Sequence, residues 1–220
     1  IAVVGAGICG LFTGLSLARK GFDVTLFERD VPPPEGNAEK AFFTWQRRGA
    51  AQFRHPHAFL GLMCSVLGEN YPDLLDELLA AGARKLTFED MVPDHLTDQY
   101  QPESGDEQLW MLLCRRATIE TVLRHYVARE PNLRIQSQTY VTDVIVEEAQ
   151  SVPGERTLTV TGLELTDRHN QNTKSTHSAD IIINASGRAD KFYQWLRHKG
   201  AEIVEQRDDA EIRRPHFLQG

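Results

Sequence analysis

The 220-residue sequence contains few cysteines and no apolar stretch long enough for a membrane span. Its three cysteines, Cys9, Cys64 and Cys114, lie far apart without a CxxC pair, so the sequence indicates no disulfide framework, dithiol redox pair or zinc knuckle. We expect all three to be buried, reduced thiols. Every apolar run is shorter than the roughly 20 residues that a transmembrane helix needs. A soluble, cytoplasmic protein that makes no contact with a membrane is therefore expected.

Positive charge is also scarce. Lysine and arginine number 24 against 31 aspartates and glutamates, which gives a formal net charge of −7. No local cluster of basic residues offsets this average, so a nucleic-acid partner is not expected, and the partner should be a small-molecule substrate. The hydrophobic content of 41% is sufficient for a real core in one large domain or two small ones.

The first 29 residues carry the most informative pattern. An apolar run over 1–4 leads into the sequence GAGICG, a helical pattern continues to Gly21, and a second β-rich run ends at Glu28. This order predicts a strand, a glycine turn, a helix and a second strand, which together form a βαβ unit.

The three glycines and the acid suit a dinucleotide site. Gly5 permits the tight turn, Gly7 allows a pyrophosphate to approach the backbone, and Gly10 allows the helix to pack close to the strand. The amino terminus of the helix attracts phosphates, and Glu28 stands where a carboxylate binds ribose hydroxyls. The alternative is a glycine turn that is merely structural.

The rest of the chain indicates an α/β protein. An apolar triplet at 181–183 followed by Asn184-Ala185-Ser186-Gly187 is typical of a strand buried on both faces of a parallel sheet that enters a glycine turn. We expect helices at 58–67, 73–81, 115–130 and 192–199, strands at 110–113, 133–135, 140–148 and 157–166, a turn at Pro153-Gly154 and an exposed hairpin tip at 167–178. The region from about 139 to 178 should be an antiparallel meander.

Three stretches match one family when they are taken together. These are GAGICG with Glu28, the helix start Arg115-Arg116-Ala117-Thr118-Ile119-Glu120, and the segment Ala179-Asp180-Ile181-Ile182-Ile183-Asn184-Ala185-Ser186-Gly187-Arg188. The combination resembles the flavoprotein monooxygenases related to para-hydroxybenzoate hydroxylase, a grouping that includes flavin-dependent halogenases and geranylgeranyl reductase-like enzymes. The resemblance implies a Rossmann-like FAD-binding domain with a parallel sheet, an antiparallel β-meander and part of a substrate domain.

The same resemblance implies ligands and contacts. FAD would be the bound cofactor, with NADPH or NADH as a transient co-substrate. Arg116 would contact the phosphate or ribose region of FAD, and Gly187 would lie close to its adenosine part. Arg29, which follows Glu28, is a further candidate cofactor contact. The alternative for Arg116 is a solvated arginine at a helix start, although a helix amino terminus disfavours cations unless an anion balances them.

A second arginine is implied in the stretch after the second strand, above the ribityl and phosphate side of the flavin. Arg47, Arg48 and Arg54 are the candidates, and Arg47 or Arg48 is favoured against the alternative of surface arginines. The nearby His55-Pro56-His57 does not predict a metal site, because no further ligand follows at a suitable spacing.

The sequence begins at Ile1 already within a strand pattern and stops at Gly220 without a helix or cap to finish it, so we expect a piece of a longer protein. The later Gly-Asp motif of the family, which would contact the ribityl chain and pyrophosphate, is also missing. The expected divisions are an FAD-binding βαβ unit with a helical excursion (1–83), a possible start of a substrate domain (84–110), the rest of the FAD-binding domain (111–200) and a truncated substrate domain (201–220). No side chain is an obvious acid, base or nucleophile, so catalytic residues stay unassigned. The resemblance implies an FAD-dependent oxidoreductase, most specifically an NAD(P)H-dependent monooxygenase acting on a small organic substrate. The alternatives are a reductase or halogenase of the same fold, and a non-catalytic NAD-binding module.

Overall fold

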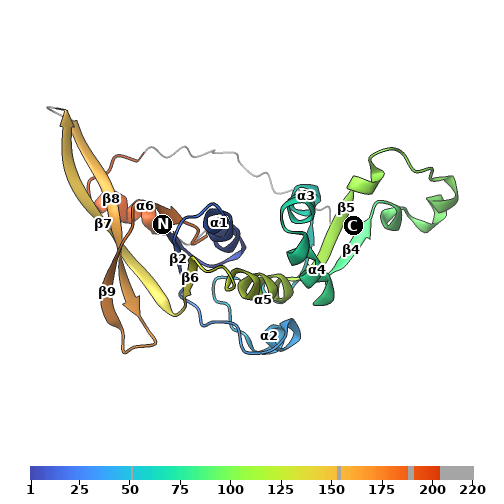
Figure 1. Cartoon of the computed structure of the whole chain (residues 1–220), viewed down its shortest axis with the longest axis horizontal. Coiled ribbons are helices and arrows are strands. Elements are labelled where there is room, and N and C mark those ends of the chain that lie inside the picture. Colours follow the sequence, from blue (N-terminus) through green and yellow to red (C-terminus); the bar gives the residue numbers. More distant parts are fainter. Residues whose placement is uncertain (51, 153–154, 188–190, 204–220) are drawn as a thin grey trace, which may run out of the picture.

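The computed structural model describes residues 1–50, 52–152, 155–187 and 191–203. The molecule is elongated, with three regions side by side along its longest axis (Figure 1). A parallel sheet with its helices occupies the middle, a long antiparallel ribbon lies at one end, and an excursion of helices and a small sheet lies at the other. The predicted α/β fold class is confirmed. The expected division at 201–220 falls mostly outside the described residues.

The central sheet has four parallel strands in the order β10-β1-β2-β6. The predicted βαβ unit, β1-α1-β2, lies at the centre of this sheet, where β1 is flanked on both sides and completely buried. Strand β6 arrives from a distant part of the chain and extends the sheet beside β2. The elements are β1 (Ala2–Val4), α1 (Ile8–Arg19), β2 (Val24–Phe27), β6 (Leu133–Gln136) and β10 (Ile182–Asn184).

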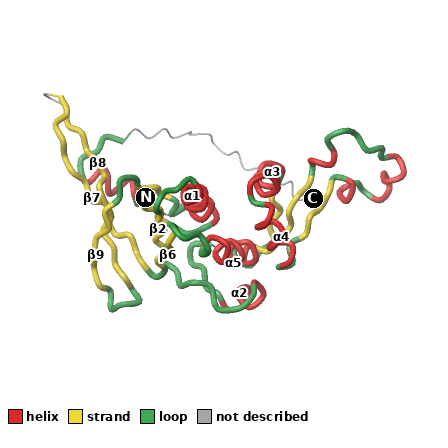
Figure 2. The backbone as a smooth tube through the Cα atoms, in the orientation of Figure 1, coloured by secondary structure: helices red, strands yellow, loops and turns green. Residues whose placement is uncertain are grey.

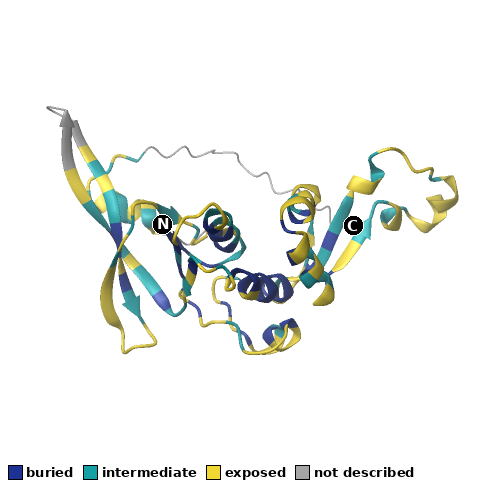
Figure 3. Cartoon of the chain, in the orientation of Figure 1, coloured by how far each residue is buried: buried dark blue, intermediate teal, exposed yellow. Residues whose placement is uncertain are grey.

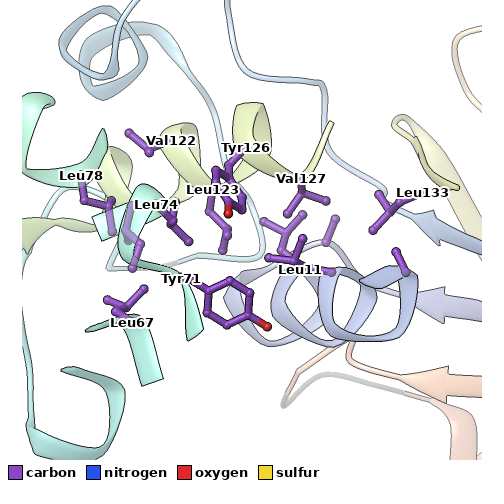
Figure 4. Packing of buried hydrophobic residues seen from close by; sticks show 14 of the residues in the cluster. Leu11, Leu67, Tyr71, Leu74, Leu78, Val122, Leu123, Tyr126, Val127 and Leu133 are labelled. Atoms are coloured by element: carbon purple, nitrogen blue, oxygen red, sulfur yellow. The ribbon is translucent and has the colours of Figure 1, made fainter. Parts of the chain in front are cut away.

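The main core lies between α1, α5 (Arg116–Val127), α3 (Gly61–Asn70) and α4 (Pro72–Ala80) (Figure 4). Leu11 and Leu15 are one helical turn apart on α1, and Ile119 and Leu123 are similarly spaced on α5; none of the four is exposed. Burying side chains of this size stabilises the fold by about 1.5–3 kcal/mol each. This packing holds the amino-terminal end of α5 next to the amino-terminal end of α1.

The excursion is a three-stranded antiparallel sheet, β3-β5-β4, with short 3-10 helices between β4 and β5 (Figure 2). The prediction of helix at 58–67 is wrong for Ala58 and Phe59, which are paired with Leu113 and Leu112 of β5. Pairing with a strand so far along the chain leaves no signal in the local pattern. The elements are β3 (Pro56–Phe59), β4 (Arg84–Thr87), β5 (Trp110–Arg115), η1 (Glu89–Met91), η2 (Asp94–Gln99) and η3 (Asp106–Gln108).

Two helix ends show how local chemistry sets element boundaries. Helix α4 ends directly before Ala81 and Gly82, and Gly82 has a φ of +95°, which is the left-handed conformation of a C-cap glycine. A further helix that the sequence pattern did not predict, α2 (Ala38–Thr44), begins after Asn37. The Asn37 side chain accepts a hydrogen bond from the Lys40 amide at 3.0 Å, as an N-cap residue does.

The predicted antiparallel meander is confirmed as the ribbon β7-β8-β9. Residues 173–178 were expected in an exposed hairpin tip, but they form an exposed edge strand, and only 168–172 make the turn. A strand needs only backbone partners, and β8 supplies them although the β9 side chains are polar. The turn expected at 153–154 lies outside the described residues. The strands are β7 (Thr139–Val152), β8 (Glu155–Asp167) and β9 (Thr173–Ser178).

Burial is concentrated on α1, α5 and the central strands, whereas β9 and the region between β4 and β5 are exposed (Figure 3). The expectation that 181–183 is buried on both faces is wrong. Ile181 is 49% exposed, and β10 pairs with β1 alone among the described residues. Helix α6 (Phe192–His198) packs near β7. Within the described ranges, no helix has both the length and the hydrophobicity to cross a membrane.

Candidate functional site

A cavity of about 580 Å³ lies at the carboxyl ends of β1, β2 and β10, beside the amino terminus of α1. Open α/β sheets bind ligands in this place. The segments that contribute to its wall are the glycine turn, the end of β2, the loop after α2, the start of α5, the start of β7, and the turn after β10 with α6. The cavity therefore collects residues from almost the whole length of the chain.

The three predicted glycines have different surroundings. Gly5 has a φ of +100°, and a Cβ added to it would lie 2.5 Å from the Ala185 carbonyl oxygen. A Cβ on Gly10 would lie 1.9 Å from the Gly5 carbonyl oxygen, whereas a Cβ on Gly7 would meet nothing within 4 Å. Gly5 and Gly10 therefore serve close packing, and Gly7 faces open space. Gly5 and Gly7 line the cavity, but Gly10 does not.

The amino terminus of α1 is open toward the cavity. Gly7 is its N-cap, so no side chain caps the helix, and its first turn holds no acidic residue. Backbone N–H groups and the helix dipole at such an end favour an anion. Cys9, in this first turn, lines the cavity and is exposed, which corrects the expectation of a buried thiol. Cys64 and Cys114 are buried as expected.

Glu28 follows β2 and lies in the cavity wall with only 5% exposure. One carboxylate oxygen accepts from the Ala6 amide at 3.0 Å, and the other accepts from the Asp30 amide at 2.9 Å. The Arg47 Nη1 atom lies 3.0 Å away in an ion pair. Burial alone would raise the pKa of Glu28, but the Arg47 charge and the Asp30 amide hold it below its usual value. The carboxylate is therefore charged and fixed in direction.

Arg47 lines the cavity but is itself a buried cation. Its guanidinium contacts Glu28, Asp30 at 3.1 Å and Glu120 at 2.8 Å, and it donates to the Ala6 carbonyl at 3.3 Å. Burial alone would lower the pKa of Arg47, but the charges of Glu28 and Glu120 raise it above its usual value. Four acceptors thus surround the guanidinium.

The two other arginines from the same stretch lie elsewhere. Arg48 is exposed and is not part of the cavity wall. Arg54 is exposed as well, and it donates to the carbonyl oxygens of Phe42 and Phe43 at the end of α2. Of these candidates, the structure brings Arg47 alone to the cavity.

Arg116 is the first residue of α5 and lines the cavity. Its Nε donates to Glu120 one turn later at 2.6 Å, and its side chain is 25% exposed. Arg29 is exposed and also lines the cavity, as does Gly187, which has a φ of +84°. The structure therefore gathers Gly5, Gly7, Glu28, Arg29, Arg47, Arg116 and Gly187 around one space and leaves Gly10 and Arg48 outside it.

Several residues near the cavity were not predicted. Glu120, which holds Arg116, could have been found from its spacing of four residues on a helix. The first residues of β7 and the side chains Lys191, Phe192 and Trp195 complete the wall. They come from segments whose position depends on the whole fold, so no local pattern identifies them. In the part of the chain that the structure describes, no three or more His, Cys, Asp or Glu residues form a group that could hold a metal ion.

Comparisons with known proteins identify the family. The profile of the "FAD dependent oxidoreductase" family matches residues 1–201. A 60-residue segment, 27% of this chain, is 35% identical to the NAD-dependent dihydropyrimidine dehydrogenase subunit PreT of Escherichia coli K12 and covers 12% of that protein. PqsL of Pseudomonas aeruginosa matches 94% of this chain with a TM-score of 0.58 and 14% identity, over 46% of its own length.

The p-nitrophenol 4-monooxygenase PnpA of Pseudomonas putida matches 83% of this chain with a TM-score of 0.53 and 16% identity, over 39% of its own length. These two structural likenesses show a shared fold. The chain spans 12% of the length of the curated relative and less than half of each solved chain. Because the family profile extends over nearly all of the sequence, the chain belongs to the FAD dependent oxidoreductase family.

Proposed function

We propose that the cavity binds FAD and that the protein is an NAD(P)H-dependent monooxygenase acting on a small organic substrate. The observation that carries the first part is the presence of an open glycine at a helix amino terminus and a buried carboxylate in the wall of the same cavity. The first feature suits a pyrophosphate and the second suits a ribose. When bound, FAD would supply the hydride and oxygen chemistry.

The residues of the wall fit such a ligand. Gly7 leaves room for phosphate oxygens beside the α1 amides, and Arg116 offers a permanent charge nearby. Two amides and the Arg47 guanidinium already contact Glu28, which has about four acceptor positions, so capacity remains for a ribose hydroxyl. We assign the turn at Gly187 to the adenosine part, and Arg29 to a contact at the exposed edge of the site.

The first test concerns Glu28. Replacing Glu28 by Gln keeps a polar group but removes the charge, so FAD binding should weaken by about 1–3 kcal/mol. A titration that follows quenching of flavin fluorescence measures this affinity. Glu77 pairs with the exposed Arg129 beyond the carboxyl end of α5, and neither residue lines the cavity. Glu77→Gln is therefore a control that should leave the affinity unchanged. An unaltered affinity in Glu28→Gln would remove the ribose assignment.

The monooxygenase part of the proposal is supported by the likeness of the fold to PnpA and by the sequence resemblance described above. The sequence has a single GxGxxG turn, which FAD would occupy, so a nicotinamide nucleotide should bind only transiently. The region 84–110, proposed as the start of a substrate domain, has a hollow of about 400 Å³ with a mostly apolar wall. Such a surface suits an organic substrate.

An anaerobic experiment tests the monooxygenase proposal. The purified protein, loaded with FAD, is mixed with NADPH and then with NADH, and bleaching of the flavin band is followed over time. Reduction should be accelerated by a suitable aromatic substrate, and in air without substrate some reducing equivalents should appear as hydrogen peroxide. If neither nucleotide bleaches the flavin across a range of substrates, a reductase that receives electrons from another donor becomes the better assignment.

A further inference from the structure

A carboxylate that does not line the cavity holds two arginines that do. Glu120 lies in the first half of α5, and none of its surface is exposed. One of its oxygens accepts from Arg47 Nε at 2.8 Å, and the other accepts from Arg116 Nε at 2.6 Å. Glu120 therefore joins the loop after α2 to the start of α5 behind the cavity wall.

The choice of nitrogen matters for what the arginines can do. Because Glu120 binds each guanidinium through Nε, the terminal nitrogens of both groups are left for other partners. Those of Arg47 contact Glu28, Asp30 and the Ala6 carbonyl. Those of Arg116 make no hydrogen bond to any residue that the structure describes, although Arg116 lines the cavity. Arg116 is thus oriented from behind and keeps its terminal donors for a ligand.

We infer that Glu120 is a positioning residue of the dinucleotide site. It sets Arg116 for the phosphates and, through Arg47, fixes the carboxylate of Glu28 for the ribose. This inference rests on the proposal that the cavity binds FAD. Both links depend on one carboxylate. A change at Glu120 should therefore weaken the contacts to the phosphates and the contacts to the ribose at the same time.

A purely structural role is the competing explanation, because Glu120 also balances buried charge. Three acids, Glu28, Asp30 and Glu120, stand near Arg47, Arg116 and the buried Arg124. Burial and the nearby Arg47 charge lower the pKa of Arg124 to about 10, although the three acids partly offset these effects. Removing Glu120 could therefore destabilise the fold without touching ligand recognition. Ligand affinity and thermal stability must be measured separately.

The test compares Glu120→Asp with Glu120→Gln in the full chain. Glu120→Asp keeps the charge but is one methylene shorter, so it should fold even if Glu120→Gln does not. The control is Thr121→Val, since Thr121 is the buried neighbour on α5 and its hydroxyl has no hydrogen-bond partner among the described residues. The melting temperature is recorded without ligand, and the affinities for FAD and for ADP-ribose are measured by calorimetry.

We expect Glu120→Asp to weaken the binding of both FAD and ADP-ribose about tenfold or more, while Thr121→Val changes neither. In an Arg116→Met background the effect of Glu120→Asp should be clearly smaller, because one of its two links is already gone. Equal effects in both backgrounds would overturn the link to Arg116. A lower melting temperature with unchanged affinities would show a structural role only.

The two proposals fail in different ways. If the unmodified chain binds neither FAD nor ADP-ribose, the proposed function fails before Glu120 is considered. If the unmodified chain binds both and Glu120→Asp binds them equally well, FAD binding stands and the positioning role of Glu120 is overturned.

Discussion

Two regions border the same cavity and are built on opposite principles. The glycine turn, residues 5–10, shapes its side of the cavity with backbone and an absence of side chains. The ion cluster, formed by Glu28, Asp30, Arg47 and Glu120, adjoins the turn at Ala6 and adds buried charge to the wall through Glu28 and Arg47. The turn depends on van der Waals distances between Gly5, Gly10 and the backbone at Ala185, whereas the cluster depends on ion pairs such as that of Arg47 with Glu120. The first should respond to side-chain volume and the second to charge and pH.

Replacing Arg47 by Met should have the largest effect on stability. The side chain is only 3% exposed and contacts three acids, so its loss leaves several buried negative charges without a partner. Breaking a buried ion pair in this way costs about 3–5 kcal/mol. Urea denaturation measures the loss, and exposed Arg48→Met is the matched control that should change stability by less than about 0.5 kcal/mol. Equal stabilities of the two variants would mean that the cluster is not the fixed network seen here.

Gly10→Ala should have the second-largest effect on stability, and it tests the glycine turn. Alanine normally favours a helix interior over glycine, but here the added Cβ would lie 1.9 Å from the Gly5 carbonyl oxygen. The backbone must move, at a cost of about 1–3 kcal/mol. Gly61→Ala in the first turn of α3 is a suitable control, because a Cβ there meets nothing within 4 Å. A stabilised Gly10→Ala variant would contradict the close contact between the turn and α1.

Gly7→Val should destabilise the fold by only about 1 kcal/mol, as expected when valine replaces glycine at an N-cap. Its side chain would enter the open space beside the α1 amides, so FAD binding should be lost although the chain stays folded. Circular dichroism and gel filtration with FAD separate the two effects. Flavin that stays bound to Gly7→Val after gel filtration would place the pyrophosphate elsewhere.

Acid should weaken the ion cluster gradually and leave the geometry of the glycine turn untouched. The folded-state pKa of Glu28 lies below its usual value of 4.5, so its contribution to stability is complete above that value and is lost as pH falls through the folded pKa. Thermal melts below pH 4.5 measure this loss. In Glu28→Gln the same part of the pH profile should be flatter, and an unchanged slope would show that Glu28 does not contribute.

The sequence predicted what is determined locally. The βαβ unit, the helix expected at 115–130 and the meander follow from short-range patterns, and the structure confirms each of them. It did not predict that Ala58 and Phe59 pair with β5, or that 173–178 form a strand, because both depend on partners elsewhere. The exposure of Cys9 likewise follows from the open end of α1.

The candidate site shows the same limit. Glycines and the acid after β2 could be recognised by spacing, and the structure brings most of them to one cavity. The surroundings of Arg47 could not be foreseen, because its three acidic partners come from two distant parts of the chain. Choosing between Arg47 and Arg48 required knowing which of two adjacent side chains points into the protein.

The wall of the cavity runs from Val4 to Trp195, so a ligand held there would touch segments that are remote in sequence. Such a ligand would connect the first strand, α5, the ribbon and α6 through non-covalent contacts. Because it would bind only the folded chain, a concentration 100 times its dissociation constant would add about 2.7 kcal/mol to the free energy of unfolding. The amount of folded protein in the cell would then depend on the supply of flavin nucleotide. A measurement of that amount would report how much cofactor is available.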